Sequence, residues 1–179
     1  MSRLFYLFAS LLMTQAPALM ADDVFIPNMQ SRPKEVETTP TASWRELTMP
    51  LPPLPDDNDL VEFTLDGAVS PFRYFVDSKH LLASADAVVR YTLVIESRSG
   101  SRNLSYEGIR CTPQGQYKVF AYGTNAQFVA LNENEWRPID DAGSERYRSD
   151  LWRFHFCMPS EFKPRLKTDI LRSLTATNR

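Results

Sequence analysis

The run AVVRYTLVIES, from Ala87 to Ser97, is the strongest strand signal in this 179-residue sequence. Its apolar side chains recur at every second position, which places Val89, Tyr91, Leu93 and Ile95 on one face. An alternation with a period of two is typical of a β-strand that buries one of its two faces. The run therefore predicts a central strand with one face in a hydrophobic core.

The residues on both sides of this run predict further strands. A polar turn at residues 98–102 leads into a returning strand at 103–111. Short connections of this kind give antiparallel neighbours, because a parallel crossover needs a dozen or more residues. The other expected strands are 60–65, 73–77, 116–122, 127–131 and 135–139.

The C-terminal part predicts helix as well as strand. Residues 144–151 could start a helix, whereas 152–157 alternate like a strand. Pro164 suits the first turn of a final helix. The apolar stripe of that helix is Leu166, Ile170, Leu171 and Leu174. The predicted fold class is α+β, with a single antiparallel β-sheet and one or two helices, including a C-terminal helix.

The composition is that of an ordinary globular domain. Hydrophobic residues make up 43% of the chain and charged residues 23%, so disorder of the whole chain is excluded. Lys and Arg number 20 and Asp and Glu 22, which gives a net charge of -2. Without a basic excess to neutralise phosphates, we expect no nucleic-acid partner.

The first 21 residues predict a secretory signal peptide. Arg3 precedes the apolar run 4–13, which is too short to span a bilayer, and small residues follow. We expect cleavage after Ala21, with Ala18 as the alternative. No cysteine lies near either position, so the chain is not a lipoprotein by sequence. The mature chain has no predicted transmembrane segment and is expected to be periplasmic or otherwise exported.

Residues 22–43 predict a flexible leader, and residues 44–179 a single domain. The leader has three prolines and no apolar period that could bury a face. At the start of the domain, the proline-rich stretch 49–55 must be extended. We expect it to lay Leu51 and Leu54 across the domain's own surface, with a partner's groove as the alternative.

The two cysteines, Cys111 and Cys157, are expected to form a disulfide, because an exported protein folds in an oxidising compartment. His155 lies close enough to Cys157 to suggest a metal site. On a strand, however, these two side chains share a face and lie too close together, and we predict no metal and no cofactor. Because Cys157 would share its face with Arg153 and His155, a bulge or a strand end must turn its sulfur inward.

Several motifs resemble one family of exported bacterial proteins. DAVVRYTLVI, residues 86–95, followed by NLSYEGIRC, residues 103–111, is the most specific of them. The supporting motifs are Trp44 ahead of Leu51-Pro52-Pro53, Phe75-Val76-Asp77 and Phe156-Cys157. Over residues 44–159 the chain is similar to the cryptic-neisserial-protein-like family, although Ala87 replaces the glycine expected after the aspartate. The resemblance implies a bacterial envelope protein and no particular activity, because the family is uncharacterised.

The central hairpin holds the candidate binding residues. If it pairs residues whose numbers sum to 200, Val89 lies opposite Cys111, Tyr91 opposite Ile109, and Arg90 opposite Arg110. Like charges opposed on a sheet are unfavourable unless they are compensated. Either an internal carboxylate compensates them, or the arginines bind an anion, since paired guanidinium groups suit carboxylates and phosphates. The internal candidates are Asp77, Asp86 and Glu107, and the candidate ligand-binding residues are Arg90, Arg110, Glu107 and Tyr106.

The sequence favours a non-catalytic binding or interaction module. Ser160 and Lys163 have the Ser-x-x-Lys spacing of penicillin-recognising enzymes, but the companion motifs are missing. We therefore predict no catalytic residue. The expected partner is an unknown envelope protein, bound through the aromatic surface or the proline-rich stretch. The alternative is a small periplasmic anion-binding protein or enzyme that holds a small anionic ligand with the cluster Arg90, Arg110 and Glu107.

Overall fold

The computed structural model describes residues 43–67, 69–132, 135–141 and 145–176. The predicted signal peptide, its cleavage sites and all but the last residue of the predicted leader lie outside these residues.

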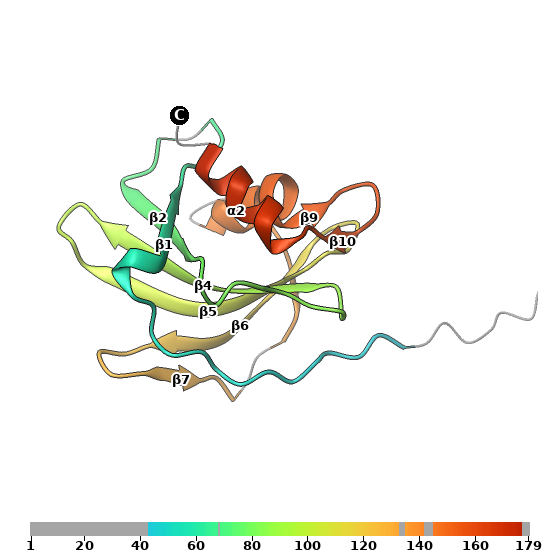
Figure 1. Ribbon diagram of the computed structural model, residues 1–179, viewed down its shortest axis with the longest axis horizontal. Helices are drawn as coiled ribbons and strands as arrows, with labels where there is room; N and C mark the ends of the chain where they lie inside the picture. The colour runs from blue at the N-terminus through green and yellow to red at the C-terminus, as the bar shows by residue number, and fades with distance from the viewer. Residues whose placement is uncertain (1–42, 68, 133–134, 142–144, 177–179) are drawn as a thin grey trace, which may run out of the picture. The chain divides into compact units, whose positions relative to one another are not determined.

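One antiparallel sheet organises the described residues, and the predicted α+β class is confirmed (Figure 1). Its strands follow the order β1-β2-β4-β5-β6-β7, with β3 beside β4 and β8 beside β6. The long hairpin of β4 (Val88–Ser97) and β5 (Arg102–Arg110) lies at the centre, where the sequence predicts it. The other strands are β1 (Leu60–Phe63), β2 (Phe72–Asp77), β3 (Leu82–Ala83), β6 (Gln116–Gly123), β7 (Phe128–Ala130) and β8 (Arg137–Pro138).

Helical segments cover one face of this sheet (Figure 1). The first is α1 (Arg146–Asp150), which continues directly into the π-helical segment η3 (Leu151–Phe156). A small hairpin of β9 (Cys157–Met158) and β10 (Lys163–Pro164) then leads to the C-terminal helix α2 (Lys167–Ala176). A short 3-10 turn, η1 (Asp57–Asp59), precedes β1.

The main core lies between the sheet and the helices. The predicted inward face of β4, which includes Tyr91 and Leu93, is buried there against η3 and α2. The ring of Phe156 contacts that of Tyr91 edge-on, with 4.9 Å between the centroids. A second, smaller cluster on the opposite face of the sheet is built around Tyr106 and Phe128. Because both faces are covered, β4 is buried along most of its length.

Two expectations for the C-terminal part are wrong. Residues 152–157 do not form a strand, because all but the last belong to η3. Their aromatic side chains do not share one face, as a strand would require: Phe156 is buried, but Phe154 is 48% exposed. Pro164 lies in β10 rather than in the final helix, which begins at Lys167. Leu166 therefore precedes α2 and is 71% exposed.

The predicted register of the central hairpin is also wrong, by two residues. Val89 lies opposite Ile109, Arg90 opposite Gly108 and Tyr91 opposite Glu107. Arg110 is opposite Val88, so the two arginines are not directly opposed. A two-residue shift leaves every side chain on its predicted face, because the period of a strand is two.

Two positions in or beside this hairpin restrict the side chain that they can hold, one by space and the other by backbone conformation. A side chain at Gly108 would lie 2.8 Å from the ring of Phe120, so only glycine leaves room for that ring. Ala87, where the family resemblance suggests glycine, has a φ of 62°. This is the left-handed region, which glycine adopts without strain and alanine does not.

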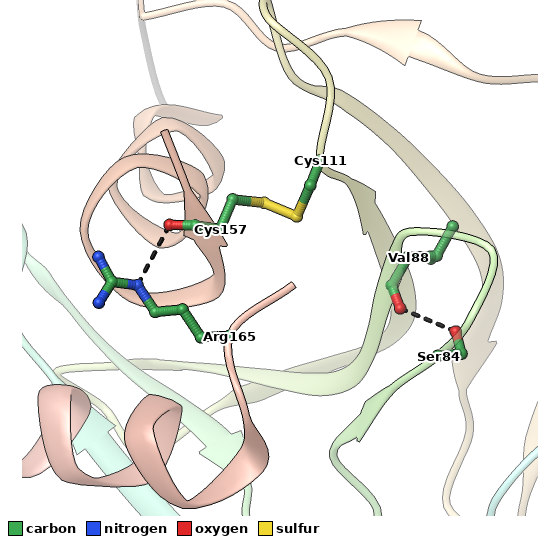
Figure 2. The surroundings of a disulfide bond; sticks show 5 residues. All are labelled: Ser84, Val88, Cys111, Cys157 and Arg165. Atoms are coloured by element: carbon green, nitrogen blue, oxygen red, sulfur yellow. Dashed lines mark hydrogen bonds between the residues drawn. A yellow bond between two sulfur atoms is a disulfide. The ribbon is translucent and has the colours of Figure 1, made fainter. Parts of the chain in front are cut away.

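A disulfide joins Cys111, just after β5, to Cys157, with 5.6 Å between the Cα atoms (Figure 2). Because η3 ends at Cys157, the chain changes direction there and the buried sulfur faces the core. Arg165 holds this end of the helix by donating from Nε to the carbonyl oxygen of Cys157, at 3.1 Å. The sulfur is thus turned inward where η3 gives way to β9, instead of at the bulge or strand end that the predicted strand would need.

Candidate functional site

Residues 44–51, which we call the strap, cross the face of the sheet opposite the helices. Both main-chain groups of Leu47 are bound by side chains of β4 and of the turn that precedes it. Its N–H donates to Asp86 Oδ2 at 2.9 Å, and its carbonyl oxygen accepts from Arg90 Nη2 at 2.8 Å. Asp86 and Arg90 thus hold an extended segment much as a neighbouring strand would.

Asp86 and Arg90 form a buried ion pair. Arg90 Nη2 lies 2.7 Å from Asp86 Oδ2, and Arg90 Nη1 donates to the hydroxyl of Ser84 at 2.6 Å. Burial raises the pKa of Asp86, but hydrogen bonds from Arg90, Ser84 and Leu47 outweigh it and lower that pKa to about 2. Of the three carboxylates suggested by the sequence, Asp86 is the one that neutralises Arg90.

Aromatic rings and a second ion pair fix the first half of the strap. The ring of Trp44 packs under the Arg110 guanidinium, 3.7 Å from the ring centroid, and edge-on against Trp136. Glu46 accepts from Lys118 Nζ at 2.9 Å and from Trp136 Nε1 at 3.1 Å. Trp44 and Glu46 of the strap are therefore both held by side-chain contacts to the rest of the domain.

Beyond Leu47 the strap covers a cavity of about 320 Å³, which we call the strap pocket. Apolar side chains line most of it. They are Leu47, Met49 and Leu51 from the strap, and Phe120, Ala130 and Leu131 from β6, β7 and the residue that follows. The polar lining includes Glu46, Arg90 and Lys118, whose charges are already paired.

The structure separates the four candidate residues of the sequence. Arg90 and Tyr106 line the strap pocket together. Arg110 lies outside its lining, where it stacks on Trp44 and donates to Gln116 at 3.1 Å, and burial lowers its pKa. Glu107 is on the opposite face, beside Tyr91 and Arg148. The predicted cluster of Arg90, Arg110 and Glu107 does not exist as one site.

The sequence reasoning missed most of the lining of the strap pocket. Lys118 and Phe120 lie on the Arg90 side of the sheet, but Phe120 does so at an irregularity in the pairing of β5 with β6. Glu46 meets Lys118 from 72 residues away. Neither an irregular pairing nor a contact across that distance leaves a periodic signal in one sequence.

Acid should release the strap from Asp86. A carboxylate with a lowered pKa contributes stability above the ordinary pKa of aspartate, about 3.9, and loses it as the pH falls through the folded value. With that value at about 2, we expect the Leu47 amide to lose its protection from hydrogen exchange between about pH 4 and pH 2. NMR-detected exchange measures this, with the amide of Leu93 in β4 reporting global unfolding.

Asp86→Asn supplies the control, because it removes the charge at every pH. In this variant the Leu47 amide should exchange faster at pH 7 and show no further acid step. A Leu47 amide that stays protected at pH 2 in the native chain would contradict the role given to Asp86.

The described residues show neither a metal centre nor a membrane-spanning helix. In this part of the chain, no three His, Cys, Asp or Glu side chains gather where they could hold a metal ion. None of the helices described is long and apolar enough to cross a bilayer.

Comparisons with known proteins point to one family. The model of the CNP1-like family matches residues 39–175. Cryptic neisserial protein 1 of Neisseria gonorrhoeae (strain ATCC 700825 / FA 1090) is 31% identical over 131 residues, a match covering 65% of this chain and 63% of that protein. The match thus spans less than two thirds of the relative. No solved structure matches the chain.

Proposed function

This chain belongs to the CNP1-like family, and we propose that it is an exported protein of the bacterial envelope that acts as a non-catalytic binding module. Residues 1–21 would be the signal peptide, 22–43 the leader and 44–179 the binding domain. The charged start, short apolar run and small residues of the first segment support export. The disulfide between Cys111 and Cys157 suits the oxidising compartment that such a protein would reach.

The strap pocket is the proposed binding site. The observation that carries this proposal is a cavity of about 320 Å³ with mainly apolar walls and a few polar groups, which is the usual make-up of a ligand site. The strap forms one wall, and the sheet forms the other. This arrangement makes the proline-rich stretch part of the site and not a separate docking peptide.

The charges around the pocket favour an uncharged, apolar ligand. Arg90 is paired with Asp86, and Lys118 with Glu46. An anion would have to displace one of these carboxylates before it could reach a cation. The occupant would therefore be an apolar molecule, or an apolar side chain of another envelope protein. We therefore propose this apolar occupant in place of the small anionic ligand of the alternative hypothesis.

Filling the pocket should abolish binding of an apolar probe. Ala130 and Val129 are exposed neighbours in β7, but only Ala130 lines the pocket. We expect Ala130→Phe to weaken binding of the neutral dye N-phenyl-1-naphthylamine at least about tenfold, because the ring occupies the cavity. Fluorescence titration of the full chain measures this affinity.

Val129→Phe is the matched control, since it adds the same ring on the other side of the strand. It should leave the affinity for the dye within about twofold of the original chain. Equal binding by the two variants, with circular dichroism showing both folded, would place the dye elsewhere and refute the proposed site.

A further inference from the structure

Two adjoining cavities lie on the helix side of the sheet, near its β6 end. They measure about 270 Å³ and about 140 Å³, and both are lined by Tyr122, Glu145 and Arg148. The larger extends across β2, β4 and β5 to Phe72, while the smaller reaches Arg137 of β8. We call the pair the α1 cleft, because Tyr147 and Arg148 of α1 form one wall. The strap pocket lies on the opposite face of the sheet, and Leu131 at the sheet edge borders both sites.

A buried guanidinium is held rigidly in this cleft. Arg148 donates from Nε to Glu107 Oε2 at 2.9 Å and from Nη2 to Oε1 at 3.0 Å. Its charged group also lies over the ring of Tyr117, 3.9 Å from the centroid. Nε and Nη2 are thus hydrogen-bonded to Glu107, and because the guanidinium is planar they also fix the position of Nη1.

The third nitrogen, Nη1, makes an ion pair but no aligned hydrogen bond. Arg148 Nη1 is buried and makes no hydrogen bond within the described residues. Its charged neighbour is the carboxylate of Glu145, 2.7 Å away, on a side chain that is 54% exposed. The ion pair with Glu145 leaves the buried N–H groups of Nη1 without a well-aligned acceptor, which is costly unless another molecule supplies one.

Aromatic rings form the rim and floor of the cleft. Tyr122 and Phe72, both in its lining, are 54% and 44% exposed. Tyr74 and Tyr147 lie deeper, with their ring centroids 5.7 Å apart. Exposed rings beside hydrogen-bonding groups suit a ligand with an apolar face and a polar edge. A pyranose ring has this form, since its C–H groups lie on its faces and its hydroxyls around the edge.

The charges of the cleft disfavour both a simple cation and a simple anion as its ligand. Its lining includes the cations Arg137 and Arg148 and the anions Glu107, Glu135 and Glu145. A cation on Tyr122 would lie close to the guanidinium of Arg148, and an anion would face the carboxylates. A neutral ligand that both donates and accepts hydrogen bonds meets neither penalty. We infer that the α1 cleft binds a neutral carbohydrate.

The inference can be tested by isothermal titration calorimetry on the full chain with chitotetraose, cellotetraose and maltotetraose. At least one of these neutral oligosaccharides should bind. Tyr122→Ala and, separately, Phe72→Ala should each weaken that binding about tenfold, because each removes an exposed stacking ring. Phe154→Ala, which removes a similarly exposed ring outside both cavities of the cleft, should leave it unchanged. N-phenyl-1-naphthylamine should not compete, because it is expected in the strap pocket.

Three outcomes would overturn the inference. They are no binding of any of the three sugars at millimolar concentration, binding that both aromatic variants retain, or binding of spermidine or citrate in place of the sugars. None of them bears on the strap pocket, whose own test uses the dye and the variants in β7.

Discussion

Replacing Arg148 with methionine should lower the free energy of unfolding by about 3–5 kcal/mol, because it leaves a buried carboxylate without its cation. Glu107 is buried on the helix face and accepts hydrogen bonds from Tyr91 and Tyr147 as well as from Arg148. The hydroxyls alone cannot offset the desolvation of a full negative charge. Urea unfolding followed by circular dichroism measures the change.

Arg153→Met is the matched control for this variant. Arg153 also pairs with a carboxylate, Asp141 at 2.6 Å, but both side chains are about half exposed. An exposed pair of this kind contributes at most about 1 kcal/mol, so the control should unfold close to the original chain. Arg148→Met with an equally small effect would mean that Glu107 is not buried as described.

The second large effect is expected from the disulfide. Changing both Cys111 and Cys157 to alanine should lower the free energy of unfolding by about 2–5 kcal/mol, because the bridge restricts the unfolded chain over a long loop. The two residues are 46 positions apart in sequence and both are buried. Urea unfolding of the variant, compared with that of the oxidised chain, gives the difference.

A reducing agent provides the internal check. Dithiothreitol should destabilise the original chain and leave the double alanine variant unaffected. Peptide mapping without reduction should recover one fragment that contains both cysteines. Two free thiols in protein taken from its own cell compartment would contradict the bridge.

The faces of the central hairpin could be predicted from the sequence, but its register could not. The period of two in residues 87–97 assigns each side chain to a face, and the structure confirms that assignment. The register depends on where the turn closes. The predicted pairing, with residue numbers that sum to 200, would centre the turn on Gly100. In the structure, Ser97 N donates to Ser101 O, which makes a different turn. A polar Ser- and Arg-rich turn leaves both closures open, and the buried pattern does not distinguish them.

The prediction of a strand at residues 152–157 was wrong for a different reason. Over residues 152–157, alternating aromatic and polar residues favour a strand when they are considered alone. The π-helical segment forms there because Leu151, His155 and Phe156 are buried together against the core, a tertiary preference that overrides the local pattern.

The candidate site was only half predictable. Arg90 and Tyr106 were found because they share a face of one hairpin. The proline-rich stretch was expected on the domain's own surface, and there Leu51 lines the pocket and Leu54 packs against the second cluster. The anchoring of the strap was missed, because Trp44 and Leu47 meet Asp86 across about 40 residues of chain and carry no periodic signal. Glu107 was placed with the wrong arginine, since its actual partner, Arg148, comes from a segment 41 residues further on.

The central claim, that the strap pocket is the binding site, is tested most directly by methyl NMR during titration with N-phenyl-1-naphthylamine. The methyl signals of Leu47 and Leu131 should shift together, because both residues line the strap pocket. Leu47 is the deciding probe, since Leu131 also borders the α1 cleft. The methyl signals of Leu166, an exposed leucine in another groove, should stay in place. Shifts at Leu166 without shifts at Leu47 and Leu131 would contradict the account.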